Sequence, residues 1–176
     1  MDRTKHLGIY LNDHLAGAMA GRELARRCLA NNGDSALGTF LEELLRDIEE
    51  DTESLTGIMD RLAVGRSPWK PQAAWVAEKV GRLKMNGRLL GYSDLSRVEE
   101  LEALLLAITG KLTLWRSLEV IAAHEPKLER SELSVLAERA EQQFRKLEGH
   151  HRDALELAFG KEDLSTRATE NEEEGP

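Results

Sequence analysis

The stretch SALGTFLEELLRDIEEDTESLTGIMDRLAVG, residues 35–65, decides the fold class of this chain. Its apolar side chains recur every three or four residues, which is the spacing of one face of an α-helix. The positions on this face are Leu37, Leu41, Leu44, Ile48, Asp51, Leu55, Ile58 and Leu62. Ser35 is suited to cap the helix at its start, and Gly65 is suited to end it. The pattern predicts one long helix with a single acidic residue, Asp51, on its apolar face.

Three further segments, residues 5–31, 96–123 and 128–159, show the same helical spacing. The face of the first carries mostly small side chains, so a neighbouring helix can approach it closely; its positions are Leu7, Leu11, His14, Ala18, Gly21, Ala25 and Cys28. Residues 32–34 are expected to form a tight turn. The third helix is expected to end before Pro126, because proline disfavours helix in the residue that precedes it. Short connections of this kind predict two helical hairpins.

The connection between the hairpins, residues 65–95, is long and has a different composition. It is rich in Gly, Pro and Trp and carries six basic side chains against two acidic ones. It is too long for a turn between neighbouring helices, so we expect it to cross the bundle and to contain a short helix near residues 72–84. Ser96 begins a capping-box pattern with Glu99 and is expected to open the third helix. The element order predicts an all-α, antiparallel four-helix bundle of two hairpins joined by a crossover.

Length and composition limit the classes of function. The 176 residues suit one helical domain, residues 1–160, followed by an acidic tail, residues 161–176, that is expected to be disordered. A net charge of -8 argues against general binding to nucleic acid or to anionic membranes. Without a signal peptide or an apolar run of about 18 residues, the expected location is cytoplasmic. Phosphate-binding loops, nucleophile elbows and Cys-x-x-Cys pairs do not occur, which argues against hydrolases and nucleotide-dependent enzymes.

Polar side chains interrupt the apolar face near the middle of the first hairpin. His14 and Asp51 lie at nearly equal distances along the chain from the turn at Gly33, so they are expected at one height. A neutral imidazole that donates to a carboxylate would satisfy both groups; alternatively, both residues bind a metal. Either arrangement avoids the cost of a buried unpaired charge. Cys28, the only cysteine, is expected to be a small core residue.

The second hairpin carries a second polar group at midlength. Glu148 and His151 are three residues apart, so they lie on the same side of their helix. Glu102, on the preceding helix, is expected at a similar height. Three interpretations are open: these side chains are metal ligands, they form a buried hydrogen-bonded pair, or they lie on a solvated helix face.

This layout resembles the ferritin-like superfamily, in whose di-metal members each hairpin supplies a Glu from one helix and Glu-x-x-His from the other. Glu102 and Glu148-x-x-His151 match that pattern residue by residue, whereas the first hairpin offers His14 and Asp51 instead. The resemblance implies a ferritin-like bundle with an incomplete di-metal motif. The candidate iron or manganese ligands are Glu102, Glu148, His151, His14 and Asp51.

Three functions are compatible with this pattern. The first is a structural or interaction protein, expected to form a dimer, in which the metal site is degenerate. The second is an iron- or manganese-dependent oxidoreductase or iron-handling protein, in which the metal activates oxygen or peroxide. The third is a sensor of a small ligand that uses the basic crossover, residues 65–95.

Overall fold

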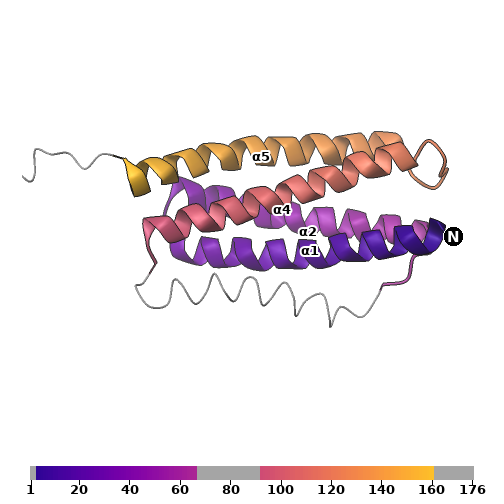
Figure 1. Cartoon of the computed structure of the whole chain (residues 1–176), viewed down its shortest axis with the longest axis horizontal. Helices are drawn as coiled ribbons and strands as arrows, with labels where there is room; N and C mark the ends of the chain where they lie inside the picture. The colour runs from indigo at the N-terminus through magenta and orange to yellow at the C-terminus, as the bar shows by residue number, and fades with distance from the viewer. Residues whose placement is uncertain (1–2, 67–91, 161–176) are drawn as a thin grey trace, which may run out of the picture.

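The structure is a computed structural model that describes residues 3–66 and 92–160. Within these ranges it contains four long helices and no strand: α1 (Arg3–Asn32), α2 (Ala36–Arg61), α4 (Asp94–Ile121) and α5 (Arg130–Phe159). The helices lie side by side along one long axis (Figure 1). The prediction of an all-α chain with four long helices is confirmed. The expected short helix near residues 72–84 and the tail, residues 161–176, lie outside the described residues.

The turn between α1 and α2 is formed as predicted. The Ser35 hydroxyl caps α2 by accepting a hydrogen bond from the Gly38 backbone N–H at 3.0 Å. A Cβ atom on Gly38 would lie 2.3 Å from the Asn32 carbonyl oxygen, so this close approach requires glycine. At the far end of α2, the Asn12 side chain donates to the Gly65 carbonyl at 3.1 Å. The beginning of α1 therefore lies beside the end of α2.

The carboxyl end of α2 differs from the prediction. The helix ends at Arg61, and Ala63 takes the left-handed conformation with a φ of 54°. The Ala63 N–H donates to the Asp60 carbonyl, and the Val64 N–H donates to the Met59 carbonyl at 2.9 Å. These two bonds make a Schellman motif, which normally has glycine at the left-handed position. The turn therefore comes before Gly65 and forms without a glycine.

The amino end of α4 also differs from the prediction. Ser93 caps the helix, because its hydroxyl accepts from the Ser96 backbone N–H at 3.1 Å. The predicted cap at Ser96 is therefore wrong by three residues. Both serines precede a helical pattern, and the local sequence alone does not distinguish them.

The core consists of two apolar clusters, each built from all four helices. Fully buried members of the first are Leu11, Ile58, Trp115 and Leu133, and fully buried members of the second are Cys28, Leu41, Leu101 and Leu147. Every predicted position on the face of α2 is buried, and Cys28 is a core residue as predicted. Asp51 on α2 and Gln143 on α5 are also buried, and along each helix they separate the two clusters. None of the helices described contains an apolar stretch that could span a membrane.

Candidate functional site

A layer of polar side chains from α2, α4 and α5 lies between the two apolar clusters. The Lys111 ammonium donates to Asp51 Oδ2 and to Gln143 Oε1, both at 2.5 Å. The Arg139 guanidinium donates to the other oxygen of Asp51. The Gln143 amide donates to Asp47 Oδ2 at 2.7 Å. These five residues are called the polar layer below.

Burial makes this layer sensitive to the loss of any charge. The side chains of Asp51 and Lys111 are only 5% and 15% exposed, so their charges are poorly solvated by water. Burial lowers the pKa of Lys111, and the neighbouring Asp51 carboxylate opposes that shift. Two cations, Lys111 and Arg139, thus balance the charge of Asp51 from two different helices. Such networks cost free energy when one partner is removed, because the remaining charge is left buried and unpaired.

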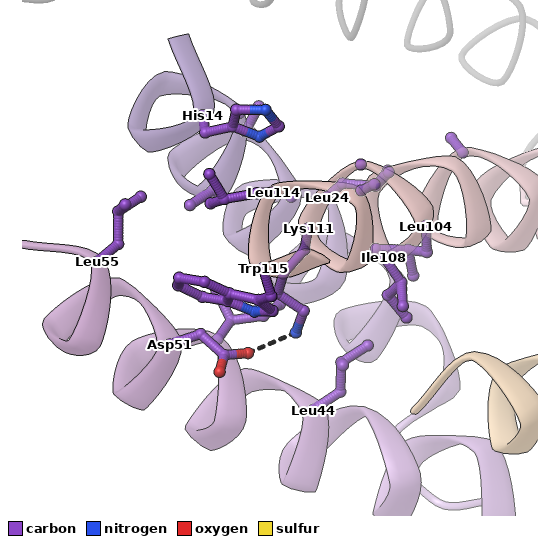
Figure 2. Close-up of a pocket in the computed structure, with 18 of the residues that line it drawn as sticks. His14, Leu24, Leu44, Asp51, Leu55, Leu104, Ile108, Lys111, Leu114 and Trp115 are labelled. Atoms are coloured by element: carbon purple, nitrogen blue, oxygen red, sulfur yellow. Dashed lines mark hydrogen bonds and ion pairs between the residues drawn. The ribbon is translucent and has the colours of Figure 1, made fainter. Parts of the chain in front are cut away.

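Next to the polar layer lies a cavity of about 410 Å³ between α1, α2 and α4. Small residues of α1 and α4 form much of its wall, namely Gly17, Ala18, Gly21, Ala103, Ala107 and Gly110. Side chains this small leave space between helices that larger residues would fill. On α2 the wall is formed by Leu44, Ile48 and Leu55. Figure 2 shows Leu44 and Leu55 facing the cavity together with residues of α4. The cavity is therefore mainly apolar, with a few polar groups on its wall.

One of these polar groups is the indole of Trp115. Trp115 is only 1% exposed and lines the cavity. Its Nε1–H has no hydrogen-bond acceptor among the residues described. Figure 2 shows the indole beside the pair formed by Asp51 and Lys111. A buried N–H without an acceptor costs about 1–3 kcal/mol, so this indole lowers the stability of the fold.

His14 is a second polar group on the cavity wall. Its ring lies edge-on to the ring of Tyr10, with the centroids 4.6 Å apart. Burial lowers the pKa of His14, and the neighbouring carboxylate of Asp13 partly opposes this. The imidazole is therefore mainly neutral at pH 7.

The predicted pairing of His14 with Asp51 is not observed. Both residues line the same cavity, so they do come near one level of the bundle. Figure 2 nevertheless places His14 well away from Asp51. Asp51 instead pairs with Lys111 and Arg139. The physical reason is charge: a neutral imidazole cannot balance a buried carboxylate, whereas an ammonium and a guanidinium can.

The candidate ligands of the second hairpin lie toward the surface. His151 Nε2 is 3.3 Å from Glu102 Oε1, so this predicted neighbour pair does form. The Glu102 side chain is 56% exposed, and Glu148 is exposed as well. Within residues 3–66 and 92–160, no group of three or more His, Cys, Asp or Glu side chains is placed to hold a metal. The five candidate ligands are therefore divided between the cavity and the opposite hairpin.

Sequence reasoning did not identify Lys111, Gln143, Arg139 or Trp115 as site residues. A signal for two of them exists in the spacing of the helices. Lys111 lies three residues after Ile108, and Gln143 lies three residues after Ala140, so each continues a buried face. Their apolar neighbours in the sequence, Leu112 and Phe144, are only half-buried. Where a long polar side chain lies next to an apolar one in the sequence, helical spacing alone does not show which of the two points into the core.

Comparisons with known proteins assign neither a family nor an activity. The chain matches no protein-family model, no curated protein and no solved structure. Its function therefore has to be inferred from the chemistry of the cavity and the polar layer.

Proposed function

We propose that this protein binds a small, mainly apolar molecule in the cavity between α1, α2 and α4. The observation that carries the proposal is the cavity itself, about 410 Å³ in volume, with apolar walls and an adjacent buried ion pair. Binding sites for small molecules typically measure about 300–1,000 Å³ and combine apolar walls with a few fixed polar groups. The buried Lys111–Asp51 pair forms one side of the cavity, and each of its charges has a further partner, Gln143 for Lys111 and Arg139 for Asp51.

The ferritin-like, antiparallel arrangement belongs to the same proposal. It is supported by the two short connections and by the contact from Asn12 to the Gly65 carbonyl, which brings opposite ends of α1 and α2 together. A metal-dependent oxidoreductase is supported less well. Asp51 is the most buried candidate ligand, and Lys111 and Arg139 already supply the positive charge that a metal would bring.

An interaction protein that forms a dimer is a second candidate. The observation that favours it is a set of large apolar side chains on α4 and α5 that are more than 60% exposed: Leu106, Val120, Val135, Leu157 and Phe159. Such side chains are common at contacts between subunits, although scattered ones also occur on monomers. Sedimentation equilibrium of the full chain tests this candidate: a mass that stays monomeric over the whole concentration range contradicts it. The cytoplasmic location is part of the proposal as well.

Binding in the cavity is tested with prodan, a neutral naphthalene ketone whose emission shifts in apolar surroundings. We expect saturable binding of one prodan per chain, measured by fluorescence titration. Gly110→Leu should weaken it by about tenfold or more, because the new side chain enters the cavity and occupies space that prodan needs.

The matched control is Gly57→Leu on α2. A Cβ atom would meet no neighbour within 4 Å at either glycine, but only Gly110 lines the cavity. Gly57→Leu should therefore bind prodan as the unmodified chain does. Equal binding to both variants, or no saturable binding to the unmodified chain, contradicts the proposed function.

A further inference from the structure

We infer that the ligand of this cavity is a linear amphiphile: a single alkyl chain that lies parallel to the helices, with an uncharged polar head at the end of the cavity near His14. The inference rests on the proposed function. It adds the chemical class of the ligand and its orientation.

The first step concerns the length of the cavity. Its lining residues extend over positions 13–24 of α1, 44–55 of α2 and 103–115 of α4. At a helical rise of roughly 1.5 Å per residue, each of these stretches is about 16–18 Å long. Three helices thus give nearly the same length, so the cavity is elongated along the axis of the bundle.

The second step concerns the width. A volume of about 410 Å³ over this length gives a mean cross-section of about 25 Å². An extended alkyl chain is about 4–5 Å wide, because nonbonded carbon atoms approach to about 3.5–4.0 Å. Each carbon extends such a chain by about 1.25 Å, so the cavity has the length of about 12–14 carbons. A single chain therefore fits both dimensions, whereas a bulky ring is too wide.

The third step concerns the two ends of the cavity, which differ in chemistry. The charged and imidazole side chains of the wall belong to one end: Asp13, His14, Asp51 and Lys111. The other end is formed by Leu24, Leu44 and Leu104, all at most 5% exposed. Figure 2 shows His14 and Asp51 on one side of the cavity and Leu104 on the other. An amphiphile would place its chain at the leucine end and its head at the polar end.

The fourth step concerns the charge of the head. Asp13 is exposed and His14 is half-buried, so the polar end is open to water. An anionic head would lie close to the carboxylates of Asp13 and Asp51. Asp51 already pairs with Lys111 and Arg139, and an exposed pair with Asp13 would contribute little, so a cationic head gains little. A hydroxyl group avoids the repulsion and can exchange a hydrogen bond with a neutral imidazole.

The experiment measures displacement of prodan from the full chain by linear alcohols from 1-hexanol to 1-dodecanol. We expect the affinity to rise about two- to fourfold with each added methylene group, because each is buried in the cavity. Cyclododecanol should bind about tenfold or more weakly than 1-decanol, after correction for the partition of each compound between water and hexadecane. Decanoate and decylammonium should both bind more weakly than 1-decanol.

Orientation is tested with Ala103→Leu, which shortens the cavity at its leucine end. Dodecanol should bind about fivefold or more weakly to this variant. Hexanol should bind as it does to the unmodified chain, because a six-carbon chain with its head near His14 does not reach position 103. Ala30→Leu is the matched control, since Ala30 is exposed on α1 and does not line the cavity, and it should change neither affinity.

The outcomes separate the inference from the proposed function. Corrected binding of cyclododecanol equal to that of 1-decanol, or equal weakening of hexanol and dodecanol by Ala103→Leu, overturns the inference while prodan binding keeps the cavity as a site. A charged decyl compound that binds as tightly as 1-decanol overturns the uncharged head. Failure of prodan and of all the alcohols to bind overturns the proposed function as well. If Ala103→Leu does not fold, the comparison of 1-decanol with cyclododecanol in the unmodified chain decides.

Discussion

At the scale of single residues, the polar layer depends on one carboxylate that serves two cations. Asp51 accepts from Lys111 on α4 and from Arg139 on α5, so it joins three helices. Arg139 also donates to Glu50 on the surface at 2.6 Å, so its charge has a second partner. Lys111 is more buried and depends more strongly on Asp51.

Asp51→Asn should lower the free energy of unfolding by about 3 kcal/mol, because it leaves the Lys111 ammonium buried without its carboxylate. Urea denaturation at neutral pH measures the change. Asp60→Asn is the matched control, since Asp60 also pairs with an arginine, Arg66, but is 64% exposed. Its effect should be below about 1 kcal/mol. Equal effects of the two substitutions would show that Asp51 is not the centre of a buried network.

His14 makes stability depend on pH in a defined direction. Its pKa in the folded protein lies below the ordinary value of 6.5, chiefly because of burial. Below that value the unfolded chain therefore binds a proton more readily than the folded chain, and stability falls as the pH decreases toward the folded pKa. Between about pH 7.5 and pH 5, the unmodified chain should lose more stability than His14→Gln. Urea denaturation at both pH values checks this, and identical losses would contradict it.

At the scale of elements, local sequence sets where α2 begins, and tertiary contacts contribute to where it ends. Ser35 caps α2 where the sequence predicts a cap, because its hydroxyl reaches the N–H of Gly38 across one turn. Met59 and Val64, two residues of the Schellman motif, are both buried in the first apolar cluster. Because Val64 packs into this cluster, the chain turns before it reaches Gly65.

Ala63→Gly should stabilise the protein by roughly 0.5–1 kcal/mol, because Ala63 has a positive φ that costs an L-residue more than the entropy lost by glycine. Thermal and urea denaturation both measure the gain. Ala122→Gly is the opposite case, since Ala122 ends α4 with helical φ and ψ of -57° and -22°. It should destabilise the protein by roughly 0.5–1 kcal/mol. A loss of stability in both variants would argue against the left-handed turn.

At the scale of the whole molecule, the two apolar clusters and the cavity belong to one helical assembly. A ligand that binds only the folded chain should stabilise all of it by mass action. With free prodan at ten times its dissociation constant, the free energy of unfolding should rise by about 1.4 kcal/mol. This corresponds to an increase of about 3–6 °C in the thermal midpoint for a chain of this size. Gly110→Leu should show a much smaller increase, and an equal increase would place the site elsewhere.

The sequence allowed most of the fold to be predicted and little of the candidate site. Four helices follow from periodic apolar residues, and the buried face of α2 was predicted position by position, including Asp51. The partner of Asp51 was not predicted. A carboxylate on an apolar face demands a partner, but the spacing does not say whether it is an imidazole from α1 or cations from α4 and α5.

The sequence by itself determined the helices, the burial of Cys28 and the presence of a charged group in the core, because these depend on residues a few positions apart along one chain. Only the tertiary structure decided that Lys111 and Arg139 meet Asp51 and that Glu102 lies at the surface. It also decided that small residues of α1 and α4 leave a cavity beside Trp115. These features depend on the rotation and relative height of helices, which place side chains from distant segments within hydrogen-bonding distance or apart.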